Sequence, residues 1–196
     1  MQLRTLTQSF VALCVVTPIE GRNNMIHELS GDLLFSKADV IAHGVAPNDD
    51  FKSGLALALR QRFPAMYKDF RHYCKQQHPK TGTLWLWQGL DQDNRHVRIA
   101  SLFTQDAPNH AGGHPGKAHT EHVNHSLHEL KKLILQEGYK SVALPRLATG
   151  VGGLDWPHVE PLIRSQLSEL NTQVGIYSEY KPGVEAAEPF GENSAS

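Results

Sequence analysis

Three glycines, a threonine and an aspartate stand close together in the stretch TGVGGLD, residues 149–155, between an apolar run and a segment with helical spacing. Glycine permits backbone conformations that other residues avoid and lets a ligand approach the main chain. Successive exposed N–H groups in such a turn form an anion nest, and a following helix N-terminus adds a favourable dipole. The stretch fits a phosphate or pyrophosphate site. It fits equally an ordinary turn in which Asp155 caps the helix.

Two other short stretches carry residues that suit a nucleotide. In SGD, residues 30–32, Asp32 follows a predicted strand, where it either caps a turn or accepts a hydrogen bond from the amine of a base. Further on, Ser53 and Gly54 begin a predicted helix, and Lys52 beside them is either a solvated loop charge or a ligand contact. No Walker A sequence is present, and no G-x-G-x-x-G opens this helix.

Histidines gather between residues 110 and 125 and raise the question of a metal site. Steps of three residues spread the last three of them around a helix instead of directing them at one point. The HExxH spacing is missing, because Glu121 is followed directly by His122. We therefore expect solvated or locally hydrogen-bonded histidines, with no metal and no cofactor. The five are His110, His114, His119, His122 and His125.

The overall composition limits the class of protein. The formal net charge is −1 without a long basic run, so a general nucleic-acid surface is not indicated, although a local basic site stays open. Cys14 and Cys74 match no metal or redox spacing, which suits a reducing compartment and a cytoplasmic protein. No stretch is long enough to span a bilayer, and we expect no membrane partner.

The hydrophobic pattern alternates between strands and helices from Met25 to Tyr180. Strands are predicted over 25–29, 39–45, 83–88, 97–103, 141–147 and 172–180, and helices from Ser53, from Pro64, over 118–136 and from Trp156. This order predicts one three-layer α/β/α domain, residues 25–180, around a central mixed sheet. Residues 1–24 form an N-terminal extension, whose short apolar run lacks a signal-peptide cleavage pattern.

The last sixteen residues differ from the patterned domain. Residues 181–196 are rich in Pro, Gly, Glu and Ala, and their few apolar side chains predict a disordered tail. Within the domain, ligands are expected where the loops at the carboxyl ends of the strands converge. The loops with the most suitable residues are 42–54, 104–117 and 148–153.

In this order the motifs resemble those of a macrodomain, the ADP-ribose-binding α/β/α module. The resemblance covers roughly Met25 to Tyr180, and its most specific parts are SGDLL, DVIAHGVAPNDDFKSGLALALRQRF and ALPRLATGVGGLDW. Within the superfamily, the sequence looks most similar to the branch that contains terminal ADP-ribose protein glycohydrolase and the antitoxin that removes ADP-ribose from DNA. The resemblance implies that the partner is ADP-ribose or an ADP-ribosylated macromolecule, with nucleic acid only as an ADP-ribosylated substrate.

The resemblance also assigns ligand-binding roles. It implies that Asp32 binds the adenine amine and that Leu33 adds backbone contacts. Ser53 and Gly54 would line the distal ribose and the diphosphate. The backbone that would wrap the diphosphate is that of Thr149, Gly150, Val151 and Gly152.

The catalytic residues of that branch do not transfer. Gln105, which is also expected to line the ligand-binding site, stands where the branch has a lysine, and Gly152 stands where the protein glycohydrolase has an aspartate. Glutamine cannot form a Schiff-base-like adduct, and glycine cannot act as a general base, so the covalent mechanism of the branch is not expected. The remaining catalytic candidates are Lys52, His43 and Asp155, although helix capping is preferred for Asp155 and a place in the core for His43.

Three functions remain open. The first is an enzyme that hydrolyses an ADP-ribosyl linkage or ADP-ribose 1''-phosphate with a positioned water and an oriented leaving group. The second is a non-catalytic reader of ADP-ribose. The third is an antitoxin-like factor that acts on ADP-ribosylated nucleic acid.

Overall fold

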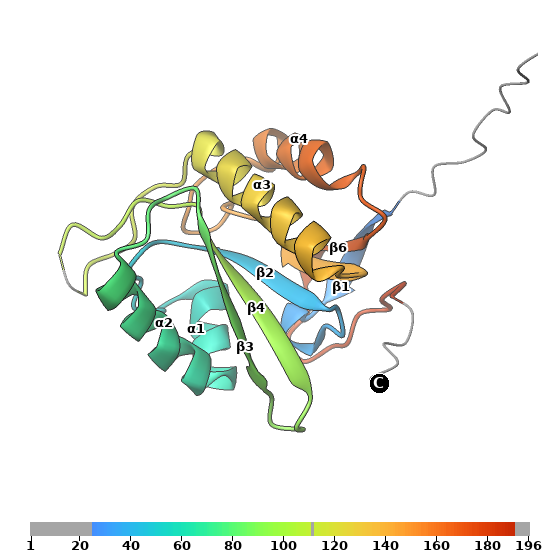
Figure 1. The fold of residues 1–196 in the computed structure, drawn as a ribbon, viewed down its shortest axis with the longest axis horizontal. Helices are drawn as coiled ribbons and strands as arrows, with labels where there is room; N and C mark the ends of the chain where they lie inside the picture. The colour runs from blue at the N-terminus through green and yellow to red at the C-terminus, as the bar shows by residue number, and fades with distance from the viewer. Residues whose placement is uncertain (1–24, 111, 191–196) are drawn as a thin grey trace, which may run out of the picture.

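The computed structural model describes residues 25–110 and 112–190, and Figure 1 shows a central sheet with helices on both faces. The strand order is β1-β6-β5-β2-β4-β3. All neighbouring strands run parallel except β3 and β4, which form an antiparallel hairpin, so the predicted mixed sheet is confirmed. The strands are β1 (Ile26–Gly31), β2 (Val40–Val45), β3 (Leu84–Leu90), β4 (His96–Phe103), β5 (Ser141–Pro145) and β6 (Gln173–Tyr180).

Four α-helices complete the three layers: α1 (Gly54–Arg62), α2 (Pro64–Gln77), α3 (Thr120–Glu137) and α4 (Trp156–Leu167). α3 and α4 pack together on one face of the sheet, and α1 and α2 lie on the other (Figure 1). The predicted apolar stripe of α3 faces the core: Val123, Leu127, Leu130 and Ile134 are all buried. None of the described helices is long and apolar enough to cross a bilayer.

The α1–α2 pair covers only part of its face of the sheet. Its cluster includes Val45, Ile99 and Phe103, which belong to β2 and β4. A separate apolar cluster contains Leu29 and Tyr177, from β1 and β6. The short helix η1 (Leu33–Phe35) and the segment that follows β6 cover this second cluster.

The segment after β6 differs from the sequence-based expectation. Residues 181–190 pack along the domain through backbone and side-chain hydrogen bonds, and Ala186 and Phe190 contact the cluster that contains Tyr177. The composition predicted disorder for this segment, whereas these ten residues pack on an apolar strip of the sheet that the α1–α2 pair covers only in part. Residues 1–24 and 191–196 lie outside the described part of the chain.

Candidate functional site

Hydrogen bonds join three of the loops at the carboxyl ends of the parallel strands. The backbone N–H of Gln105, just after β4, donates to the Val45 carbonyl at the end of β2 (3.4 Å). Gln105 also forms an isolated antiparallel bridge with Ala118, and the Ala118 N–H donates to the Gly152 carbonyl at 3.0 Å. The loops after β2, β4 and β5 therefore meet, as the strand order predicts.

The glycine-rich loop after β5 is a compact turn with unused donors. The Leu154 N–H donates to the Ala148 carbonyl (3.0 Å), and the Gly153 N–H donates to the Gly150 carbonyl (3.1 Å). The four N–H groups from Thr149 to Gly152 donate to no acceptor among the described residues. A row of free N–H groups beside a helix N-terminus is an arrangement that binds an anion.

Two glycines of this loop have different surroundings. A Cβ atom built at Gly150 meets nothing within 4 Å, and this residue is exposed. A Cβ atom at Gly152 would lie 2.6 Å from the Ala148 carbonyl oxygen and 2.9 Å from the Ala118 Cβ. Gly152 is therefore required for packing between the loops, whereas Gly150 leaves open space above the turn.

Asp32 lies at the far end of the site, directly after β1. It is buried, and its carboxylate accepts hydrogen bonds from the N–H groups of Leu34 (3.1 Å) and Gly183 (2.9 Å). The N–H of Leu33 donates to no acceptor among the described residues. An acceptor and a donor thus stand side by side at this position, which is complementary to the amine and the neighbouring ring nitrogen of adenine.

The strand order sets the distance between Asp32 and the glycine-rich loop after β5. β6 lies between β1 and β5, so Asp32 and the glycine-rich loop are two strand spacings apart, or about 10 Å. The loops after β2 and β4 extend the row by two further spacings, so the whole edge spans about 20 Å. An elongated ligand that lies along this edge can therefore contact Asp32, then the glycine-rich loop and then the loop after β2.

The loop after β2 presents Lys52, Ser53 and Gly54, which are all exposed. Ser53 occupies the N-cap position of α1 without a side-chain cap hydrogen bond, and Gly54 has a left-handed φ of +55° with open space around it. The Lys52 ammonium contacts the Asp50 carboxylate (3.2 Å) and the Gly112 carbonyl (3.1 Å). Lys52 thus joins this loop to the loop after β4.

His43 lies in the core of the structure. It is 1% exposed, and its Nε2 lies 2.9 Å from the Ser101 hydroxyl on β4. Burial lowers the pKa of His43 from its ordinary 6.5 to about 4, so the ring is neutral near pH 7. This burial supports the expected core position and argues against direct proton transfer to a ligand.

Gln105 and Asp155 differ in burial and in the hydrogen bonds of their side chains. Gln105 is buried, and its amide donates to the Gly116 carbonyl (3.1 Å), so it supports the loop after β4. Asp155 occupies the predicted N-cap position of α4 and is exposed, but its side chain makes no cap hydrogen bond. The expected capping bond is therefore absent, and the carboxylate remains available for other partners.

Comparison with known proteins assigns this architecture. The family model described as Macro domain matches residues 42–163, which is more than half of the chain. The chain belongs to the Macro domain family. The match begins within β2 and ends within α4, so it includes the loops after β2, β4 and β5.

Individual relatives of this macrodomain differ in length and name. A DNA ADP-ribosyl transferase–DNA ADP-ribosyl glycohydrolase fusion protein of Thermosipho africanus is 27% identical over 163 residues, covering 76% of this chain and 40% of that protein. An ADP-ribose 1''-phosphate phosphatase of Lodderomyces elongisporus is 25% identical, covering 71% and 88%. The structure of Thermosipho africanus DarTG in complex with ADP-ribose shares the fold, with a TM-score of 0.69 at 24% identity over 82% of this chain and 42% of that one. The macrodomain thus spans about two fifths of the fusion protein.

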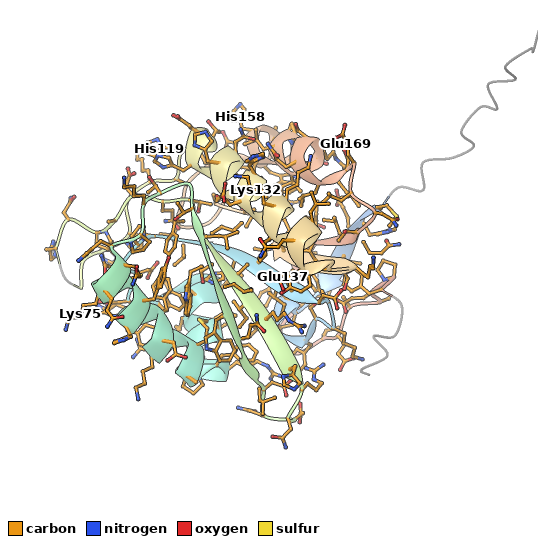
Figure 2. The ribbon with its side chains drawn as sticks, viewed as in Figure 1. Lys75, His119, Lys132, Glu137, His158 and Glu169 are labelled. Atoms are coloured by element: carbon orange, nitrogen blue, oxygen red, sulfur yellow. The ribbon has the colours of Figure 1, made fainter. Side chains whose placement is uncertain are left out.

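Two of the five clustered histidines form local side-chain contacts. His119, at the start of α3 (Figure 2), lies 2.9 Å from the Asp106 carboxylate, and His122 lies 3.3 Å from the Thr81 hydroxyl. Within residues 25–110 and 112–190, no group of three or more His, Cys, Asp or Glu residues is arranged to hold a metal ion. His119 and His122 thus make the local contacts that we expected, and His110, His114 and His125 are exposed.

Sequence reasoning missed two residues near the loops. A Cβ atom at Gly44 would lie 2.8 Å from the Thr104 hydroxyl and 3.7 Å from the Ala148 nitrogen, so Gly44 lets the loops after β4 and β5 approach β2. Glycine inside an otherwise apolar strand was the available signal for such an approach. Tyr180 is exposed at the end of β6 and is paired in register with Gly31, next to Asp32. An aromatic residue at the predicted end of the strand over 172–180 was its only signal in the sequence.

Proposed function

We propose that this macrodomain binds ADP-ribose or a derivative, and that it hydrolyses an ADP-ribosyl linkage or ADP-ribose 1''-phosphate. The observation that carries the proposal is the row of four free N–H groups from Thr149 to Gly152. It lies about 10 Å, or two strands, from the base site at Asp32. That separation suits a diphosphate joined to adenosine.

The base end supports the same ligand. The Asp32 carboxylate can accept from the adenine amine, and the free N–H of Leu33 can donate to the adjacent ring nitrogen. The exposed ring of Tyr180 offers a surface on which a base can stack. A guanine or hypoxanthine base presents an oxygen in place of the amine, and the Asp32 carboxylate would repel it.

Lys52 and Asp155 carry the chemistry that we propose. Lys52 lies in the loop beside Ser53 and Gly54, where the distal ribose would lie, and its charge stabilises a departing anion such as phosphate. Asp155 has an exposed carboxylate without a capping bond, which suits it to accept a proton from an attacking water. Water attacks the anomeric carbon or the phosphorus and its proton passes to the carboxylate. The bond from that atom to the leaving group breaks, and its electron pair stays on the departing group, where the Lys52 ammonium stabilises the charge.

A reader without turnover is the second candidate. Gln105 donates to Gly116 and Gly152 packs against Ala148, so the two positions at which the related branch carries catalytic groups have structural roles here. The names of the relatives include both a glycohydrolase and a phosphatase, and these names support turnover. An antitoxin-like action on ADP-ribosylated DNA is one form of the first proposal.

A two-stage experiment separates these functions. Calorimetric titration with free ADP-ribose comes first, and absence of binding at millimolar ligand would refute every ADP-ribose function. The protein is then incubated with ADP-ribosylated DNA, mono-ADP-ribosylated protein and ADP-ribose 1''-phosphate. Product release that falls at least tenfold in both Lys52→Gln and Asp155→Asn supports the enzyme and its proposed residues. Binding without release of any product identifies a reader.

A further inference from the structure

Residues 181–190 are here called the strap. The strap runs from the end of β6 along η1 and contacts the residues at both ends of η1. Immediately after β6, Lys181 and Val184 close a turn in which the Val184 N–H donates to the Lys181 carbonyl (3.2 Å). Gly183, within that turn, has a left-handed φ of +70° and open space around its Cβ position. Proline followed by glycine at the centre of a turn is the combination that favours this geometry.

The turn binds Asp32 in two ways. The Gly183 N–H donates to one oxygen of the Asp32 carboxylate (2.9 Å), and the Asp32 N–H donates to the Val184 carbonyl (2.7 Å). The other carboxylate oxygen accepts from Leu34, in η1 (3.1 Å). Asp32 is therefore fixed by donors from two segments that are about 150 residues apart in the chain.

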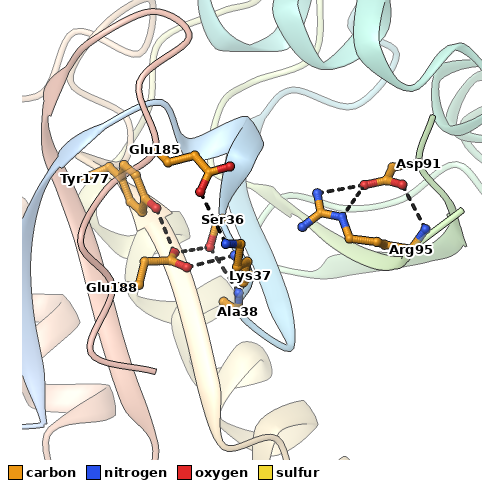
Figure 3. A network of polar contacts seen from close by, with 8 residues as sticks. All are labelled: Ser36, Lys37, Ala38, Asp91, Arg95, Tyr177, Glu185 and Glu188. Carbon is orange, nitrogen blue, oxygen red and sulfur yellow. Dashed lines mark hydrogen bonds and ion pairs between the residues drawn. The ribbon is translucent and has the colours of Figure 1, made fainter. Parts of the chain in front are cut away.

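Glu188 anchors the other end of the strap, as Figure 3 shows. Its carboxylate accepts from the Ser36 hydroxyl, from the Lys37 N–H (2.8 Å) and from the Tyr177 hydroxyl (2.7 Å). Ser36 and Lys37 follow η1 directly, whereas Tyr177 belongs to β6. The strap thus ties η1, the short helix that Asp32 caps, to β6.

Glycines under the strap show that its close approach is built into the sheet. A Cβ atom at Gly31 would lie 2.9 Å from both the Ala186 nitrogen and the Val184 carbonyl oxygen. A Cβ atom at Gly175 would lie 2.8 Å from the Phe190 ring. A larger side chain at Gly31 would meet the backbone of the strap and push it away from β1, whereas at Gly175 the nearest atoms are the ends of the Leu29 and Phe190 side chains.

We propose that the strap positions Asp32 for the base, so that residues 181–190 set the preference of this macrodomain for adenine over a 6-oxopurine. The inference rests on the proposed binding of ADP-ribose. The hydrogen bond from Gly183 holds one carboxylate oxygen and so directs the remaining lone pairs toward the base site. Without that bond the carboxylate rotates, and its discrimination between an amine and an oxygen weakens.

A matched pair of glycine variants tests the proposal. Gly183→Val places a β-branched side chain at φ +70°, which valine disfavours, and so shifts the turn without a clash. Gly138→Val imposes the same penalty at the end of α3, because Gly138 has φ +69° and equally open surroundings. Each protein is titrated with ADP-ribose and with inosine diphosphate ribose, and its thermal midpoint is recorded.

We expect the wild-type chain to prefer ADP-ribose by about tenfold or more, the usual value of a hydrogen bond to a charged group. In Gly183→Val the preference should fall to about twofold, mainly through weaker ADP-ribose binding. Gly138→Val should lose similar stability and keep the wild-type preference. Glu188→Ala, which frees the far anchor, should reduce the preference less than Gly183→Val.

The titrations distinguish failure of the proposed ADP-ribose binding from failure of the proposed role of the strap. If the wild-type chain binds neither nucleotide, the proposed function itself is wrong and the inference falls with it. If the wild type prefers ADP-ribose and Gly183→Val keeps that preference, the strap has only a structural role. A rise in ADP-ribose affinity in Gly183→Val would also overturn the inference, because the strap would then obstruct the base.

Discussion

Gly150 offers a direct test of the diphosphate site, because the residue is exposed and nothing lies within 4 Å of its Cβ position. Its φ lies outside the left-handed region, so a side chain adds no backbone strain. Gly150→Glu should therefore fold as the wild type does, with its carboxylate in the space above the free N–H groups. A charge about 5 Å from one phosphate charge costs about 3 kcal/mol at an effective dielectric constant of about 20.

Exposure to solvent reduces this cost. Screening at an exposed position brings the repulsion to about 1.5 kcal/mol, which corresponds to about a tenfold rise in the Kd for ADP-ribose. Gly150→Gln has nearly the same shape without the charge and measures the steric part alone. Calorimetry at low and high salt should show that the ratio of the Kd values of Gly150→Glu and Gly150→Gln for ADP-ribose falls as salt is added, whereas the ratio of Gly150→Gln to wild type does not. If Gly150→Glu binds ADP-ribose within twofold of the wild type, the diphosphate does not lie over this loop.

Three other changes test the surroundings of the site. Gly152→Ala should lower the free energy of unfolding by about 2 kcal/mol in urea titrations, because its Cβ would lie 2.6 Å from the Ala148 oxygen; an unchanged midpoint would contradict this packing. Because the pKa of His43 falls from 6.5 to about 4 on folding, the unfolded chain binds the extra proton between these values, and stability is lost as pH falls through them. Wild-type stability should drop by about 2 kcal/mol from this group between about pH 7 and 5, and the drop should vanish in His43→Gln. Asp155→Ala should change the unfolding free energy by less than about 1 kcal/mol, since no capping bond is present, and a larger loss would indicate a cap in solution.

Local patterns were sufficient to predict the layers and the loops. The α3 stripe repeats at helical spacing and faces the core, and Pro64 begins α2, so both helices could be placed from neighbouring residues alone. The convergence of the loops followed from the alternation of strands and helices. The position of Asp155 before α4 was also predicted, but whether its carboxylate bonds the helix depends on a side-chain rotamer, which the sequence does not specify.

The strap could not be predicted, because it depends on contacts between distant residues. Glu188 bonds Ser36 and Lys37, about 150 positions earlier, and the segment carries too few apolar residues to show a periodicity. The sequence likewise gives no means of distinguishing Gly150, which is open, from Gly152, which is crowded by another loop. Such differences are created by tertiary packing and have no local signal.

The place of β1 at the edge of the sheet has a consequence for how this chain is made. Within the described sheet, β1 has β6 as its only neighbour, and β6 begins at Gln173. During synthesis β1 therefore leaves the ribosome long before β6 exists, and its backbone groups stay unpaired until β6 arrives. A chain interrupted before Gln173 would expose the edges of both β1 and β5, which favours aggregation and degradation. The β1–β6 pair, and with it the contact between Asp32 and the strap, therefore forms only after translation has passed β6.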